Sequence, residues 1–424
     1  MNSYHIWTIG CQMNTADSER LAGALEQLGL EAASSPRDAD VVVLNSCVVR
    51  QGAEDKVVGN LGSMKSIKQR RPGSILALMG CMVGPKPDDL KARFPYVDTF
   101  MQPQRFGPLL EMVGDRLGLD WEGCVGPLLP PQPSVRSYVP IIHGCDLMCT
   151  FCIIPYRRGR QDSRPVAEVV DEVRALVQRG VKEVTLLGQT VDAYGYDLAG
   201  QPSLAELLNA LNSIDGLLRI RFLTSHPSFM SRDIIEAVAS LDKVCEHINL
   251  PVQAGDDQVL ERMRRRYTAA EYRQLVADIR DAIPDASIST DIIVGFPGET
   301  REQYDSTVRM VKDLEFSKVH AAAYSPRPGT IAHRSMPDDV SAEDKDYRLR
   351  KLDLLQEEIL TKSNAAFLGQ QLEVLVDSHH KGKWQGRTRS DKLVFIEDEG
   401  DLLGHMLDVR ITRTSPWSLQ GAVV

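Results

Sequence analysis

The stretch HGCDLMCTFC, residues 143 to 152, decides the fold. It places Cys145, Cys149 and Cys152 in a C-x3-C-x2-C pattern directly after a predicted strand. Three thiolates this close together suit three irons of a cubane 4Fe–4S cluster and leave the fourth iron open to a small molecule. A zinc site is the alternative. It needs a fourth ligand such as His143, and zinc sites usually pair cysteines as two C-x2-C halves, so the pattern favours the cluster.

Outward from this motif, residues 138–330 alternate predicted strands with predicted helices. Right-handed crossovers would curl six such units into a partial (β/α)6 barrel, with its active face at the carboxyl ends of the strands. The predicted strands are 139–143, 183–188, 219–224, 247–251, 287–294 and 318–324. The predicted helices are 166–178, 203–214, 231–239, 269–282 and 301–314, and a charged helix follows at 341–363.

The N-terminal part shows a second strand–helix rhythm. Apolar runs at 4–9, 41–44 and 75–79 alternate with helical patterns such as 16–28, which predicts a Rossmann-like α/β domain with a parallel sheet. The last 60 residues instead show short β-rich runs separated by glycines, which predicts a small five-stranded all-β barrel. The predicted parts are an N-terminal domain at 2–118, a proline-rich linker at 119–137, the partial barrel at 138–362 and the small barrel at 364–424.

A cysteine follows each of the three N-terminal apolar runs, at Cys11, Cys47 and Cys81. Parallel strands of one sheet end at the same edge, so we expect these thiols to converge there and to hold a second cluster. Inert buried thiols are the alternative, because free cysteine is often a small core residue. Cys124 and Cys245 stand apart from both triads, and Cys245 lies in the apolar run VCEHINL, which is typical of a core strand.

The composition is that of a globular cytoplasmic protein. Of 424 residues, 43% are hydrophobic and 25% charged, and no window has the roughly 20 apolar residues that span a bilayer. The first residues lack the basic start and apolar stretch of a secretory signal. Eight cysteines in such a chain favour metal binding over disulfides. The net charge of −9 provides no overall attraction to nucleic acid, so RNA binding requires local basic patches.

Several motifs occur in order along the chain: GCQMN, NSC…AEDK, GCM, GC…C.FCIIPYRRGR..SRP, LLGQ, TSHP, LPVQ.G.D, D.IVGFPGET and YSPRPGT. With them the chain resembles the radical S-adenosylmethionine (SAM) methylthiotransferases over essentially its whole length, and GCQMN and TSHP are most similar to the MiaB type. The resemblance implies an N-terminal methylthiotransferase domain, a radical-SAM partial barrel and a C-terminal RNA-binding TRAM barrel. Three places depart from the family pattern: Val83-Gly84 stand where Ala-Gln is usual, Thr190 where Asn is common and Ala254 where Ser is usual.

The resemblance also implies an activity: methylthiolation of carbon 2 of N6-dimethylallyladenosine at position 37, in the anticodon stem-loop of tRNA. In the family's mechanism one SAM methylates a sulfur on the N-terminal cluster, and a second SAM yields a 5′-deoxyadenosyl radical at the cluster of Cys145, Cys149 and Cys152. A radical suits this reaction because an aromatic C–H bond has no useful acidity. An electron donor of the flavodoxin or ferredoxin type and a sulfur donor are expected partners, and we expect a monomer with no membrane partner.

By the same resemblance, SAM is held by residues at the strand ends. They are Phe151, Gly188, Gln189, Gln253, Gly295 and Glu299. Glycines at barrel corners also occur simply for turns, which is the alternative for each glycine. No role is assigned to Thr190 or Ala254, because these two positions depart from the family pattern.

The small barrel carries the strongest local basic patch, in HHKGKWQGRTRSDK. We expect it to contact RNA through Lys381, Lys383, Arg387 and Arg389, with Trp384 as a stacking platform for a base. Two further patches lie at residues 157–160 and 262–266, although a run of charge is often just a solvated face.

Two other functions fit part of the sequence. A member of the same family could act on threonylcarbamoyl-adenosine in tRNA or on an aspartate of a ribosomal protein, and the GCQMN signature argues against both. A non-catalytic iron–sulfur RNA-binding regulator, from a different class, leaves the SAM-type turns and the six-unit barrel unexplained.

Overall fold

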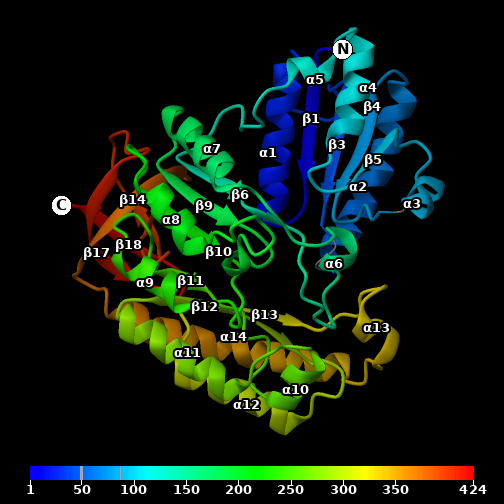
Figure 1. The fold of residues 1–424 in the computed structure, drawn as a ribbon. Coiled ribbons are helices and arrows are strands. Elements are labelled where there is room, and N and C mark those ends of the chain that lie inside the picture. The colour runs from blue at the N-terminus through cyan, green and yellow to red at the C-terminus, as the bar shows by residue number, and fades with distance from the viewer. Residues whose placement is uncertain (48–50, 86) are drawn as a thin grey trace. The chain divides into compact units, whose positions relative to one another are not determined.

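In the computed structural model, which describes residues 1–47, 51–85 and 87–424, the chain forms two compact units. Their secondary-structure elements are labelled in Figure 1. The N-terminal unit comprises Met1–Pro133, Tyr138–Leu147 and Ile153–Asp162. The C-terminal unit comprises Ser134–Ser137, Met148–Cys152 and Ser163–Val424. Among the described residues, no helix has the length and apolar content that crossing a bilayer requires.

The N-terminal unit is built on a parallel five-stranded sheet in the order β2-β1-β3-β4-β5. Its strands are β1 (Ser3–Thr8), β2 (Glu31–Ala32), β3 (Val41–Ser46), β4 (Ile75–Gly80) and β5 (Thr99–Met101). Its helices are α1 (Gln12–Gln27), α2 (Gln51–Arg70), α3 (Asp88–Arg93), α4 (Gly107–Leu117) and α5 (Trp121–Cys124), and α6 (Ile154–Arg157) joins the unit from later in the chain.

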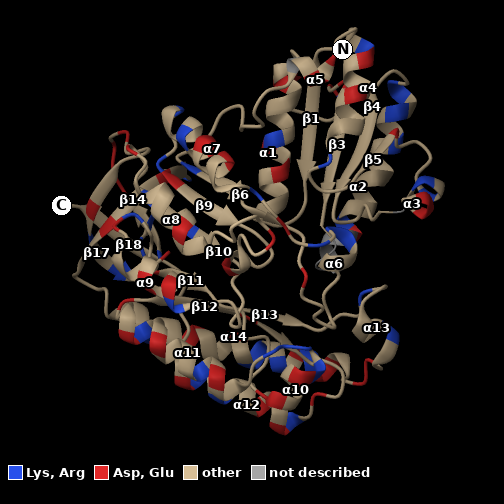
Figure 2. Ribbon diagram, in the orientation of Figure 1, with Lys and Arg blue, Asp and Glu red and all other residues tan. Residues whose placement is uncertain are grey.

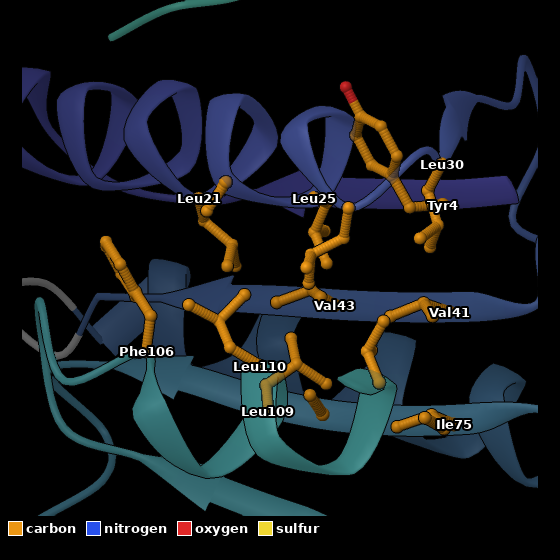
Figure 3. Packing of buried hydrophobic residues seen from close by; sticks show 14 of the residues in the cluster. Tyr4, Leu21, Leu25, Leu30, Val41, Val43, Ile75, Phe106, Leu109 and Leu110 are labelled. Atoms are coloured by element: carbon orange, nitrogen blue, oxygen red, sulfur yellow. The ribbon is translucent and has the colours of Figure 1, made fainter. Parts of the chain in front are cut away.

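Both faces of this sheet are buried, which explains why the central strands are apolar except for Asn45 and Ser46 at the end of β3. On β3, Val41 and Val43 pack in one hydrophobic cluster, with Leu21 and Leu25 of α1 and with α4. Figure 3 shows these side chains pointing toward one another between α1, β3 and α4. The alternating residues of β3 and β4 face the other way and pack in a second cluster that includes Leu61 of α2. A parallel sheet covered by helices on both faces is the expected outcome of this pattern.

The C-terminal unit contains the partial barrel. It has two three-stranded sheets, in the orders β10-β9-β6 and β11-β12-β13, in which β9 and β10 pair in parallel and β12 pairs in parallel with β11 and β13. An isolated parallel bridge between Ile220 and Val244 links the two sheets. The strands are β6 (Arg136–Pro140), β9 (Glu183–Leu187), β10 (Arg219–Leu223), β11 (His247–Asn249), β12 (Ser287–Val294) and β13 (Lys318–Ala323). A separate two-stranded sheet consists of β7 (Ile142–His143) and β8 (Asp162–Ser163), and all of it except Ser163 is assigned to the N-terminal unit.

Helices connect the barrel strands, as the sequence predicts. They are α7 (Val166–Gln178), η1 (Val191–Ala193), α8 (Leu204–Asn212), α9 (Arg232–Ser240), α10 (Asp257–Arg262), α11 (Ala269–Ala282), α12 (Arg301–Leu314), α13 (Ile331–Ser335) and α14 (Ala342–Ala365). Thr268 and Thr300 form capping boxes at the starts of α11 and α12, which is why those boundaries could be predicted to the residue. Strand β11 ends two residues earlier than predicted, before Pro251, which has no backbone N–H to donate to a sheet.

The last part of the C-terminal unit is a closed five-stranded barrel in the order β14-β15-β16-β18-β17, as predicted. Its strands are β14 (Gln371–His380), β15 (Lys383–Thr388), β16 (Leu393–Ile396), β17 (Met406–Thr414) and β18 (Leu419–Val423). Two arginines of β10 attach it to the partial barrel. Arg219 donates to Glu373, and Arg221 donates to the carbonyl oxygens of Thr388 and Arg389. Both arginines are buried, and their hydrogen bonds hold the small barrel against the partial barrel.

Candidate functional site

The three N-terminal cysteines lie at one edge of the parallel sheet. Cys11 caps the start of α1, Cys47 follows β3 and Cys81 follows β4. A hydrogen bond from the Cys47 thiol, assisted by the charge of Arg158, lowers the pKa of Cys11 to about 6. Burial instead raises the pKa of Cys81, and Arg158 opposes that rise. The arrangement therefore brings thiols and a guanidinium into one site.

Two structural details position these thiols. Gly80 has φ of +102°, and a Cβ there would lie 2.3 Å from the Ser46 carbonyl oxygen, so only glycine lets Cys81 leave β4 beside Cys47. Asn14 accepts a hydrogen bond from the Cys11 backbone N–H and donates to Asn45 of β3. This amide network ties the start of α1 to β3 and explains the asparagine of the GCQMN motif.

The three cysteines offer the thiolate donors that an iron–sulfur cluster needs. In a cubane cluster each thiolate binds a different iron. The described cysteines form no disulfide, which leaves their thiols available as ligands.

Cys145, the first cysteine of the second triad, lies in the N-terminal unit. Its backbone N–H donates to the Gly159 carbonyl oxygen, and its sulfur accepts a hydrogen bond from the Leu147 N–H. The preceding Gly144 has φ of +67°, and a Cβ there would lie 2.0 Å from the Arg160 carbonyl oxygen. The glycine of the HGC motif is therefore required for the chain to double back against residues 159–160.

Cys149 and Cys152 lie in the C-terminal unit, on a segment that is hydrogen-bonded to the end of α10 and the residue after it. Thr150 between them donates two hydrogen bonds, from its N–H to the Met263 carbonyl oxygen and from its hydroxyl to the Arg262 carbonyl oxygen. Arg265 is almost fully buried and donates to the Cys149 sulfur at 3.6 Å. An N–H donor aimed at a cysteine ligand is a recurrent way of tuning an iron–sulfur cluster. In the sequence this arginine stands out only as a member of the basic run at residues 262–266.

The residues expected to hold SAM lie at several strand ends. Phe151 makes an edge-on contact with Phe296 of the GFPGE turn, so the cysteine segment and that turn are neighbours. Gly188 and Gln189 directly follow β9, and Gln189 has its side-chain oxygen buried without a hydrogen-bond partner among the described residues. A buried acceptor of this kind is costly unless a ligand or water satisfies it, which suits a binding role.

Two other residues expected to bind SAM are Gln253, which has a strained backbone conformation, and Glu299, whose side chain stabilises a turn. Gln253 has φ of +73°, a left-handed conformation that is strained for a residue with a side chain and that often marks functional sites. Glu299 is buried, and its carboxylate accepts a hydrogen bond from the Gly295 N–H and an ion pair from Arg348 of α14. Glu299 therefore closes the turn that Gly295 begins.

Asp192 and His226 are buried polar residues that sequence reasoning did not single out, although His226 stands in the TSHP motif. Asp192 accepts a hydrogen bond from the His226 backbone N–H, but its Oδ1 has no partner among the described residues. Burial raises the pKa of Asp192 to about 8 and lowers the pKa of His226 to about 3. Both side chains are therefore neutral at pH 7.

Asp192→Asn tests this neutral state. The folded pKa lies above the unfolded one, so between about pH 4 and 8 the folded wild type binds an extra proton and loses stability as pH rises. We expect the unfolding free energy of the variant, relative to wild type, to increase by up to about 1.4 kcal/mol per pH unit across that window and then level off. Urea unfolding at several pH values measures it. Asp278→Asn, at an exposed position on α11, is the control, and its unfolding free energy relative to wild type should not change with pH. If this relative free energy is also independent of pH in Asp192→Asn, the Asp192 carboxyl is not neutral in the folded protein.

The predicted RNA-contacting residues lie on and beside β15, but they differ in their surroundings. Lys381 is exposed in the turn after β14, and Trp384 packs against His379. Lys383 pairs with Glu397, and Arg387 with Asp391 of the same strand–turn segment. Arg389 pairs with Glu246 of the partial barrel and donates to the Asp242 and Val244 carbonyls, contacts that fasten the small barrel.

The two other basic patches contain buried members. Figure 2 shows Lys and Arg at α6 and around α10. Arg262 donates to Gln303, and Arg265 is buried beside Cys149. Arg158 is also buried, whereas Arg160 is exposed and pairs with Asp146. In both patches, some of the arginines bond to other residues of the chain and are therefore not free to bind RNA phosphates.

Three protein-family models match the chain in the order of its predicted parts. "Uncharacterized protein family UPF0004" matches residues 3–102, "Radical SAM superfamily" matches 139–311 and "TRAM domain" matches 365–424. Among solved structures, the radical SAM methyltransferase TsrM from Kitasatospora setae has a TM-score of 0.59 at 16% identity, covering 78% of this chain and 77% of its own. OxsB, a cobalamin-dependent SAM radical enzyme, has a TM-score of 0.53 at 11% identity and covers 84% of this chain and 56% of its own. At these identities the likeness concerns the fold.

Relatives of known name match over the full length. The tRNA-2-methylthio-N(6)-dimethylallyladenosine synthase of Roseiflexus is 49% identical, covering 99% of this chain and 89% of the relative. Enzymes of the same name from Herpetosiphon aurantiacus and Dehalococcoides mccartyi are each 48% identical, and they cover all of this chain and 98% and 99% of their own lengths. The chain therefore belongs to the tRNA-2-methylthio-N(6)-dimethylallyladenosine synthase family of radical SAM proteins.

Proposed function

We propose that this chain is a transferase that inserts a methylthio group at carbon 2 of N6-dimethylallyladenosine at position 37 of tRNA. The observation that carries the proposal is the combination of a cysteine triad at the edge of the N-terminal sheet with a C-x3-C-x2-C triad next to SAM-type turns, in a chain that matches synthases of this name from end to end. The proposed domain boundaries are 2–118, 119–137, 138–362 and 364–424.

The protein works with two 4Fe–4S clusters and SAM. When bound, the cluster of Cys145, Cys149 and Cys152 supplies the electron that cleaves SAM to a radical, and the other cluster carries the sulfur. The residues of the chain hold and position these groups. We assign Cys11, Cys47 and Cys81 to the sulfur-carrying site, where the Asn14–Asn45 network holds α1 against β3.

At the radical site, Thr150 fixes the cysteine segment, and Arg265 donates a hydrogen bond to the Cys149 sulfur. We assign SAM binding to the residues at the strand ends. There the buried side-chain oxygen of Gln189 can accept a hydrogen bond from SAM, and Phe151 can contact SAM with its aromatic ring. Gln253 and the turn from Gly295 to Glu299 complete this set, with Glu299 acting by holding the turn closed.

We assign tRNA contact to the face of the small barrel that carries Lys381, Lys383, Trp384, Arg387 and Arg389. The exposed members supply charge for phosphates, and Trp384 supplies an aromatic face for an unpaired base of the anticodon loop. Lys383, Arg387 and Arg389 are each paired with a carboxylate, and Arg389 also fastens the small barrel to the partial barrel. The chain acts as a monomer in the cytoplasm, with an electron donor of the flavodoxin or ferredoxin type and a separate sulfur donor.

Salt dependence tests the RNA-binding face. Binding to phosphates releases counterions, so Lys381→Ala/Lys383→Ala is expected to flatten the slope of log affinity against log salt concentration by about one unit per lost contact. Fluorescence anisotropy with a prenylated anticodon stem-loop at several salt concentrations measures the slope. Lys312→Ala, on the exposed side of α12, is the matched control and should leave it unchanged. An unchanged slope in the double variant would move the site to another basic surface.

The activity is tested by mass spectrometry of tRNA nucleosides. Cells that lack the gene should accumulate N6-dimethylallyladenosine without the 2-methylthio group, and the gene on a plasmid should restore the methylthio product. Accumulation of unmodified threonylcarbamoyl-adenosine instead would indicate the other tRNA substrate. Normal nucleosides in the deletion strain, together with no SAM cleavage by the reduced protein, would leave only a binding role.

A further inference from the structure

The N-terminal unit contains a buried guanidinium beside its cysteine triad. The side chain of Arg158 is 3% exposed, and its Nε donates a hydrogen bond to the Cys81 sulfur at 3.3 Å. Its Nη2 lies 3.4 Å from Oδ2 of Asp17, whose carboxylate is completely buried. We propose that Arg158, oriented by Asp17, is a positioning residue that fixes Cys81 and raises the reduction potential of the sulfur-carrying cluster. The inference rests on the proposed function, since it assigns a further residue to that site.

The buried guanidinium of Arg158 is stabilised by two partners, Asp17 and Cys81. Removing a charge from water costs several kcal/mol unless partners replace the lost hydration. The rigid guanidinium fork donates in fixed directions, so one group reaches the Asp17 carboxylate and the Cys81 sulfur together. Burial raises the pKa of Asp17, and the charge of Arg158 opposes that rise more than the hydrogen bond with Gln104 or the charge of Arg20 does.

The segment that carries Arg158 is anchored in the N-terminal unit. Ile153 is buried in the hydrophobic cluster that also contains Cys81 and residues of β3 and β4, and Tyr156 packs against the same cluster. These two contacts hold α6, so that Arg158, directly after it, is directed at the sulfur. Arg160, two residues later, is 89% exposed, so the inward direction is specific to Arg158.

The segment that brings Arg158 to Cys81 directly follows the second cysteine triad in the sequence. Arg158 stands six residues after Cys152, inside the stretch that matches the radical SAM superfamily, and yet it completes the other cysteine site. One loop therefore carries the ligands of one cluster and a hydrogen-bond donor for the second. Arg157 approaches the same edge: its Nη1 would lie 2.6 Å from a Cβ built at Gly84.

The expected effect follows from charge. An iron–sulfur cluster gains negative charge on reduction, and N–H donors and positive charge near its sulfurs stabilise the reduced form. Removing the guanidinium should therefore favour the oxidised form. It should also loosen the hold on iron, because outer partners of metal ligands typically contribute 10-fold to 100-fold to affinity.

The test uses the full chain with Cys145, Cys149 and Cys152 all replaced by alanine, so that only the N-terminal cluster is bound. In this background Arg158→Gln is expected to shift the reduction equilibrium at least tenfold toward the oxidised form, about 59 mV for one electron, in a titration followed by electron paramagnetic resonance. Iron should also leave faster to a chelator. Arg160→Gln, which removes the same charge from an exposed position, is the control and should shift the equilibrium less than twofold.

Equal potentials and equal iron release in Arg158→Gln and its parent would overturn the proposal. If Arg158→Gln does not retain a cluster, Arg158→Lys replaces it, because the lysine keeps a cation but lacks the planar fork that reaches Asp17 and Cys81 together. A smaller shift in the same direction supports the proposal, and a potential equal to the parent's overturns it. Neither readout uses the methylthio product, so failure here is distinguishable from failure of the nucleoside analysis.

Discussion

Cys149→Ala is expected to lose the radical-site cluster and all cleavage of SAM. Two thiolates hold a cubane poorly, and the open iron no longer faces the SAM-binding strand ends. The loss also removes the sulfur that accepts the Arg265 hydrogen bond, so the buried arginine loses one of its partners. Iron content and the yield of 5′-deoxyadenosine from dithionite-reduced protein measure the effect.

Cys245→Ala is the matched control. Cys245 is buried like Cys149 and belongs to neither triad, and burial raises the pKa of its thiol to about 11, as expected for an inert core residue. This variant should keep its iron and its SAM cleavage, with only a modest loss of stability. Near-normal 5′-deoxyadenosine from Cys149→Ala would refute the assignment of Cys149 as a ligand.

Periodic segments of this chain could be predicted well from sequence. The bounds of α7, α11 and α12 match the predicted ranges, because each helix has a clear apolar stripe and because α11 and α12 also begin with a capping box. Helix α1 starts four residues earlier than predicted, since its first turn is polar and is held by Asn14, which bonds to Cys11 and to β3. The relevant partner of Asn14 is 31 residues away and leaves no local pattern.

The arginines beside the cysteines escaped prediction for the same reason. Arg158 meets Cys81 across 77 residues of sequence, and Arg265 meets Cys149 across 116. Both stand in runs of basic residues, which indicate an exposed RNA-binding face when only the sequence is known. Burial decides their role, and burial depends on how distant segments pack. The cysteines were easier because spacing after strands is a local feature.

Replacing Cys11, Cys47 and Cys81 together by alanine is expected to separate the two chemistries. The N-terminal sheet has its own hydrophobic clusters, so its fold should survive the change. The variant should retain about half of the iron, since one of the two clusters remains. Reduced protein should still cleave SAM, because Cys149, Arg265 and the strand-end residues are untouched, but it should form no methylthio product.

Three measurements on one preparation distinguish the outcomes: iron content, 5′-deoxyadenosine and the modified nucleoside. Cys245→Ala, processed in parallel, controls for the general effect of losing a buried thiol. Normal methylthiolation by the triple variant would refute the sulfur-carrying role of these cysteines. Complete loss of SAM cleavage would show that the N-terminal site supports the radical site, and the segment from Ile153 to Arg158 would then be the connection to examine, since it follows Cys152 directly and packs beside Cys81.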